Sequence, residues 1–183
     1  EREIEMPNMP RSALRSLPYA HRAVAIALIV VATSLLAVPT ASAKGPTHVS
    51  GFSIAPEPGA CSAPPPGFEA FTDFTMQLHG DLEGCWYTSI SYSHMQSNGR
   101  YNEFGREVFV GTVNGVPGSF STVYWFNALY DTQTGAELSG GCVHPIVRGY
   151  DGLAGVSGVI LFSDVIDDDP DGPIANMSGS VRF

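Results

Sequence analysis

Residues 82–110 read LEGCWYTSISYSHMQSNGRYNEFGREVFV, and this stretch decides the fold class. Two segments rich in aromatic and β-branched residues, 82–95 and 100–110, flank the sequence Ser97-Asn98-Gly99. Aromatic and β-branched side chains are typical of strands. Asn-Gly takes up the positive φ angles of a tight hairpin turn at little cost. The stretch therefore predicts a β-hairpin.

The same pattern continues along the chain, and no useful window shows a helical period. Short turns rich in Gly, Asn and Asp separate further predicted strands at 68–78, 119–130, 137–147, 156–163 and 174–183, and 47–54 could add an eighth. Consecutive antiparallel strands with short hairpins predict an all-β protein with a single up-and-down antiparallel β-barrel of about eight strands, because closure removes exposed edges. A β-sandwich is the alternative, but it usually has longer crossovers.

The N-terminal segment, 1–43, has the pattern of a secretory signal peptide. Basic residues between 11 and 22 precede an apolar run at 23–38, and an Ala-x-Ala sequence ends at Ala43. The run is short for a bilayer-spanning helix, so an uncleaved membrane anchor is the less favoured alternative. Residues 1–8 could precede the true start of translation.

Composition narrows the domain organisation and the partners. Residues 44–67 are rich in Pro and Gly and predict an irregular arm, followed by the barrel domain at 68–183. The chain has 9 Lys and Arg against 18 Asp and Glu, and its formal net charge is -9. This balance argues against nucleic-acid binding, which needs clustered basic residues. We expect a secreted, extracellular protein with no stable membrane association after leader cleavage, and an oligomer is compatible with the sequence.

Three cysteines are present, at Cys61, Cys85 and Cys142. An oxidising compartment favours pairing, and one cysteine must be left over. Cys85 and Cys142 lie in similar Gly-flanked strand contexts, so we predict a disulfide between them. Cys61 could instead pair with either, and sequence alone does not choose firmly among the three connectivities.

Glu103, Glu107 and His144 are the candidate catalytic residues. The two glutamates share one strand face and lie about 13 Å apart at about 3.3 Å per residue, which is too far for a glycosidase pair. Either one could act alone as a buried general acid, and His144 could work with a carboxylate as acid and base. The favoured alternatives are structural: solvent-facing or salt-bridged carboxylates, and a histidine packed among aromatic rings.

Aromatic residues on neighbouring predicted strands could line a lumen that suits a small apolar or aromatic ligand. The candidate ligand-binding residues are Tyr87, Phe109, Tyr124 and Phe126. The alternative is ordinary filling of the core of a small barrel.

Asp167, Asp169 and Asp171 match the opening of a calcium-binding loop. Ser178 occupies the twelfth position, where an EF-hand needs Glu, so a solvated acidic loop is the favoured interpretation. We therefore predict no metal site and no cofactor.

Five segments together resemble a known family: GCWYT at 84–88, YNEFGREVFVG at 101–111, GSF at 118–120, GCVHPIV at 141–147 and LAGVSG at 153–158. They are similar to secreted actinobacterial proteins with an allene-oxide-cyclase-barrel-like domain, over about residues 68–183. The resemblance implies an eight-stranded antiparallel barrel with an apolar lumen.

Allene oxide cyclases are similar in steering the ring closure of an unstable epoxide in such a lumen, and dirigent proteins are similar in orienting phenoxy radicals. No catalytic motif of either group matches this chain residue by residue, so function is a fold-level expectation. We expect a barrel that binds a small molecule. The alternatives are a cyclase-like, isomerase-like or dirigent-like enzyme that uses a buried carboxylate or histidine, and a structural or interaction protein with a plugged barrel.

Overall fold

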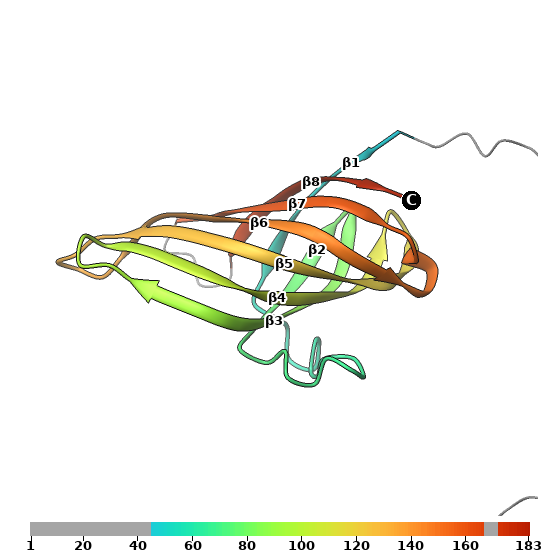
Figure 1. The fold of residues 1–183 in the computed structure, drawn as a ribbon, viewed down its shortest axis with the longest axis horizontal. Helices are drawn as coiled ribbons and strands as arrows, with labels where there is room; N and C mark the ends of the chain where they lie inside the picture. The colour runs from blue at the N-terminus through green and yellow to red at the C-terminus, as the bar shows by residue number, and fades with distance from the viewer. Residues whose placement is uncertain (1–44, 167–171) are drawn as a thin grey trace, which may run out of the picture. The chain divides into compact units, whose positions relative to one another are not determined.

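The computed structural model describes residues 45–166 and 172–183 (Figure 1). Its eight strands form one closed antiparallel barrel in chain order, with β1 pairing β8 to complete the circle. The strands are β1 (Thr47–Ile54), β2 (Phe74–Gly80), β3 (Leu82–Met95), β4 (Arg100–Val113), β5 (Val116–Tyr130), β6 (Glu137–Tyr150), β7 (Ser157–Asp164) and β8 (Ala175–Arg182), with a short 3₁₀ helix, η1 (Asp151–Leu153), after β6. The prediction of an all-β, up-and-down barrel is confirmed.

Some predicted features lie outside the described residues. They are the signal peptide at 1–43 and the calcium-loop candidates Asp167, Asp169 and Asp171. Within 45–166 and 172–183, no helix has the length and hydropathy that crossing a bilayer requires.

The central hairpin follows the prediction closely. β3 has the predicted bounds, and the turn before β4 closes with the Gly99 N–H donating to the Gln96 carbonyl at 3.0 Å. Gly99 has a φ of 83°, which a residue with a side chain rarely adopts. The hairpin ends of β3 to β6 reach well past the other strands (Figure 1).

The barrel begins earlier than the sequence boundary at residue 68 indicated. Residues 47–54 lie in the segment that composition assigned to the irregular arm, but they form β1 and pair with both β2 and β8, so the possible eighth strand is confirmed. Val49 and Ser53 are fully buried, so this segment contributes to the interior as a regular strand does. The irregular arm is therefore the connection from 55 to 73.

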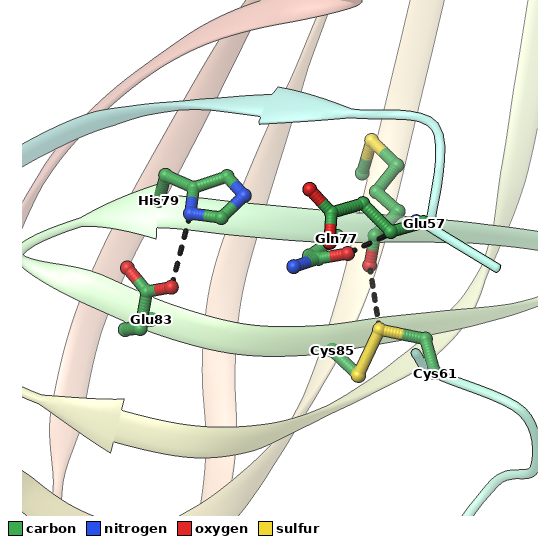
Figure 2. The surroundings of a disulfide bond; sticks show 7 residues. Glu57, Cys61, Gln77, His79, Glu83 and Cys85 are labelled. Atoms are coloured by element: carbon green, nitrogen blue, oxygen red, sulfur yellow. Dashed lines mark hydrogen bonds and ion pairs between the residues drawn. A yellow bond between two sulfur atoms is a disulfide. The ribbon is translucent and has the colours of Figure 1, made fainter. Parts of the chain in front are cut away.

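The predicted disulfide between Cys85 and Cys142 is wrong. Cys85 bonds to Cys61 instead, with their Cα atoms 5.3 Å apart (Figure 2). Cys142 is free. The reason is strand alternation: Trp86 points into the barrel, so Cys85 points outward, whereas Cys142 lines the lumen. The barrel wall therefore separates the two predicted partners.

The disulfide fastens the arm to the outer surface of β2 and β3. Nearby, the Glu57 N–H donates to Gln77 Oε1 at 3.1 Å (Figure 2). Further along, the Ile90 N–H donates to Asp73 Oδ2 at 2.8 Å. Tyr87 follows Cys85 by two residues on this outer face and is nevertheless buried.

The lumen is filled at one end and hollow at the other. The filled end packs Trp86, Phe109 and Phe120 together, with ring centroids between 5.0 and 6.0 Å apart. The next inward positions on β3 and β4 are Thr88 and Glu107, which line a cavity instead. Large apolar side chains thus close one half of the barrel, and polar side chains border the open half.

Candidate functional site

The hollow half of the lumen forms a cavity of about 560 Å³. This volume lies within the range of small-molecule pockets, about 300–1,000 Å³. Its lining combines aromatic rings with carboxyl groups, and no Lys or Arg occurs among the described lining residues. The aromatic members are Phe74, Tyr101, Tyr124, Phe126, Tyr130 and Phe162, and the acidic members are Glu103, Glu107, Glu137 and Asp164.

At the floor of the cavity, Glu107 and His144 form a buried pair. Their side chains are 3% and 1% exposed, and His144 Nδ1 lies 2.5 Å from Glu107 Oε2. Glu107 also accepts hydrogen bonds from Thr122 Oγ1 at 2.8 Å and Thr88 Oγ1 at 3.3 Å. A buried carboxylate is costly unless it is paired and hydrogen-bonded, and three strands, β3, β5 and β6, supply the partners of Glu107.

The free thiol of Cys142 completes this group. Cys142 and His144 are two residues apart on β6 and share its inward face, and His144 Nε2 contacts Cys142 Sγ. Burial, and then the negative charge of Glu107, raise the pKa of the Cys142 thiol. The sulfur is therefore a neutral thiol at physiological pH. It contacts the His144 imidazole, which in turn contacts the Glu107 carboxylate.

Higher in the cavity, Glu103 accepts hydrogen bonds from two tyrosine hydroxyl groups. Tyr101 Oη donates to Glu103 Oε2 at 2.5 Å, and Tyr124 Oη donates to Glu103 Oε1 at 2.6 Å. Burial and the hydrogen bond to Glu103 raise the pKa of Tyr124 and of Tyr101, so both hydroxyls stay protonated. The Tyr124 ring stacks on His144 with an interplanar angle of 14°, which joins this level to the floor.

A third group of cavity side chains is a pair of carboxyl groups, Glu137 on β6 and Asp164 on β7. Tyr130 Oη donates to Glu137 Oε2 at 3.2 Å. A side chain at position 140 would overlap both Glu137 Oε1 and Asp164 Oδ2, so Gly140 leaves room for the two groups to meet. Burial, followed by the hydrogen bond and negative charge of Glu137, raises the pKa of Asp164 to about 7.

The structure gathers all three predicted catalytic candidates in one cavity. Glu103, Glu107 and His144 all line it, and Glu107 contacts His144 directly. Their catalytic roles stay predictions, because lining a cavity does not establish chemistry.

The predicted ligand-binding residues separate into three groups. Tyr124 and Phe126 line the cavity, as predicted for a lumen. Phe109 points inward but belongs to the packed core, because it lies at the filled end. Tyr87 points outward, so its assignment to the lumen is corrected: strand alternation puts it opposite Trp86.

Sequence reasoning missed Tyr101, Tyr130, Glu137, Asp164 and the contact of Cys142 with His144. Glu137 and Asp164 lie at strand ends and looked like ordinary boundary residues. Tyr101 shares the alternation pattern of Glu103, so its face was readable, but its contact with Glu103 was not.

Comparison with protein-family models, with curated proteins and with solved structures finds no match for this chain. Among the described residues, no group of three or more His, Cys, Asp or Glu side chains is arranged to hold a metal ion. The cavity and its side chains are therefore the basis for a functional proposal.

Proposed function

We propose that this protein is a secreted β-barrel that binds a small, mainly apolar or aromatic molecule in its lumen. The observation that carries the proposal is the cavity of about 560 Å³ with six aromatic lining residues. Aromatic surfaces gain free energy when they exchange water for an apolar partner. The proposal also agrees with the sequence resemblance to allene-oxide-cyclase-like barrels, whose lumens hold small molecules.

The position of the cavity supports binding more than it supports a plugged barrel. Trp86 and its aromatic neighbours fill only one end of the lumen. Polar groups such as Glu107 and Thr88 occupy inward positions where apolar side chains would extend the core. A protein whose lumen served stability alone would gain by filling these positions.

Native mass spectrometry tests the proposal directly. The full chain is expressed in a secreting host, and the protein recovered from the medium is weighed under native and denaturing conditions. We expect a discrete extra mass that is lost on denaturation, and the same spectra give the N-terminus of the secreted chain. Absence of any extra mass would favour the structural alternative.

A matched pair of variants tests whether the retained molecule is bound in the lumen. Ala175→Phe adds a ring at a buried residue that lines the cavity, and we expect it to abolish the extra mass. Ala154→Phe makes the same change at an exposed position after η1 and should leave the mass unchanged. Circular dichroism confirms that both variants fold. Retention of the mass in Ala175→Phe would show that the molecule binds outside the lumen.

A second candidate function is a cyclase-like, isomerase-like or dirigent-like enzyme, favoured by the buried Glu107–His144 pair. A carboxylate that orients an imidazole is a common arrangement for proton transfer. The molecule found by mass spectrometry would be incubated with the protein in D₂O. Deuterium uptake at its carbon atoms that is lost in Glu107→Gln or Glu103→Gln would support proton transfer. If both variants showed the same deuterium uptake as the wild-type protein, these carboxylates would be excluded as the acid or base.

A further inference from the structure

We propose that the ligand of this cavity carries a positively charged amine beside its aromatic or apolar body. This inference rests on the proposed binding function and narrows the ligand class. Three features support it: the charge of the lining, the rings beside the carboxyl groups, and the two adjacent carboxyl groups of Glu137 and Asp164.

The charge of the lining is strongly one-sided. Four carboxyl groups border the cavity. The one basic side chain among the described lining residues is His144, and it is already paired with Glu107. Opposite charges interact more strongly in a partly desolvated cavity than in water. A concave surface with one sign of charge also concentrates ligands of the opposite sign. An ammonium group is therefore favoured here and a carboxylate ligand is disfavoured.

Aromatic rings surround the upper carboxyl groups. The Tyr101 ring lies 6.0 Å from Phe126 and 6.1 Å from Tyr130, measured between centroids, and both contacts are edge-on. The hydroxyls of Tyr101 and Tyr130 turn toward Glu103 and Glu137 respectively. Cations are attracted to ring faces within about 6 Å of the centroid. Carboxylates and rings together make a site that suits an ammonium group.

Glu137 loses a hydrogen-bond donor at this site when Asp164 is ionised. Its Oε1 atom is buried, and the protonated Asp164 carboxyl is the described neighbour that hydrogen-bonds to Glu137 on this side. Glu137 Oε1 and Asp164 Oδ2 both approach the point that a side chain at Gly140 would occupy. When both carboxyl groups are ionised, the hydrogen bond between them is lost and they repel. A primary ammonium has three donors and a positive charge, so it could bond Glu137 and Asp164 at once. No neutral or anionic ligand would relieve this repulsion as well.

The test compares three probes with the same indole ring: tryptamine, which is cationic, tryptophol, which is neutral, and indole-3-propionate, which is anionic. Isothermal titration calorimetry is run on the secreted protein at pH 8 with EDTA, so that no metal ion mediates binding. We expect tryptamine to bind at least tenfold more tightly than tryptophol, and indole-3-propionate to bind more weakly than both.

Variants then place the amine. Glu137→Gln should reduce the preference for tryptamine over tryptophol to less than threefold, and Glu103→Gln should reduce it as well. Glu57→Gln makes the same change on the exposed arm and should leave the preference intact. Full preference retained in both cavity variants would overturn the proposed position of the amine.

The failures are distinguishable. Equal binding of tryptamine and tryptophol, or strongest binding of indole-3-propionate, overturns the inference but leaves lumen binding in place. Absence of binding by all three probes also overturns the inference. If no retained mass is found either, the proposed function falls with it.

Discussion

Asp164 should make the protein less stable as the pH rises through the range from about 4 to about 7. Its carboxyl lies beside Glu137, and burial with that neighbour raises its pKa from 3.8 to about 7. Between these two values the folded protein keeps a proton that the unfolded chain has already lost. The free energy of unfolding therefore falls as the pH rises, and the loss is complete above about pH 7.

The magnitude follows from the size of the shift. A difference of about 3 pKa units, at about 1.4 kcal/mol per unit, corresponds to about 4 kcal/mol. Asp164 is partly accessible to solvent, which screens its interactions, so we expect about half of this value, about 2 kcal/mol. Asp164→Asn keeps the shape of the protonated acid and removes the titration, so it should not show this loss.

Urea denaturation at pH 4.5 and pH 8 measures the effect. The wild type should lose about 2 kcal/mol more than Asp164→Asn between the two conditions. Glu57→Gln controls for the general effect of removing one negative charge, because Glu57 is exposed on the arm. If the wild type and Asp164→Asn lose the same free energy, the Asp164 carboxyl is not perturbed and the argument about its surroundings is refuted.

Replacing Cys61 and Cys85 together with Ser should lower the free energy of unfolding by about 3 kcal/mol, because the bond closes a loop between residues 24 apart. Urea denaturation measures this change, and a loss below about 1 kcal/mol would contradict the prediction. Without reductant, alkylation followed by peptide mass spectrometry should label only Cys142, slowly in the folded protein and quickly in urea; label on Cys85 would contradict the pairing. Glu107→Ala should cost about 3–5 kcal/mol in urea denaturation because it leaves His144 buried without its partner, and a change below 1 kcal/mol would show that the pair contributes little.

The barrel was predictable because its signals are local. Alternation over 82–110 and the Asn98-Gly99 turn set the central hairpin, and further strands follow along the chain. The strand at 47–54 was harder to assign, because Pro and Gly in the following residues dominate the composition of that region. Its pairing with β8 joins the two ends of the barrel, which no local window contains.

The faces of the strands were predictable only relative to one another. Alternation placed Cys85 and Tyr87 on one face, but it did not say that this face points outward and that the arm bonds to it through Cys61. Glu137 and Asp164 are 27 residues apart, and they meet because β6 pairs β7 with Gly141 opposite Ser163. Such contacts depend on register across strands, which composition and spacing do not specify.

The two carboxyl groups of Glu137 and Asp164 carry a cost at high pH that a cationic ligand would relieve. Inward positions beside the packed core hold Glu107, His144, Glu137 and Asp164, where apolar side chains would add to stability. The repulsion between Glu137 and Asp164 acts fully only when Asp164 is ionised, above about pH 7. A cationic ligand binds that ionised form best, so it should stabilise the folded protein more at pH 8 than at pH 4.5. A neutral ligand lacks this dependence. The rise in Tm that tryptamine and tryptophol each give the protein at the two pH values would therefore separate recognition of charge from simple burial of a ring.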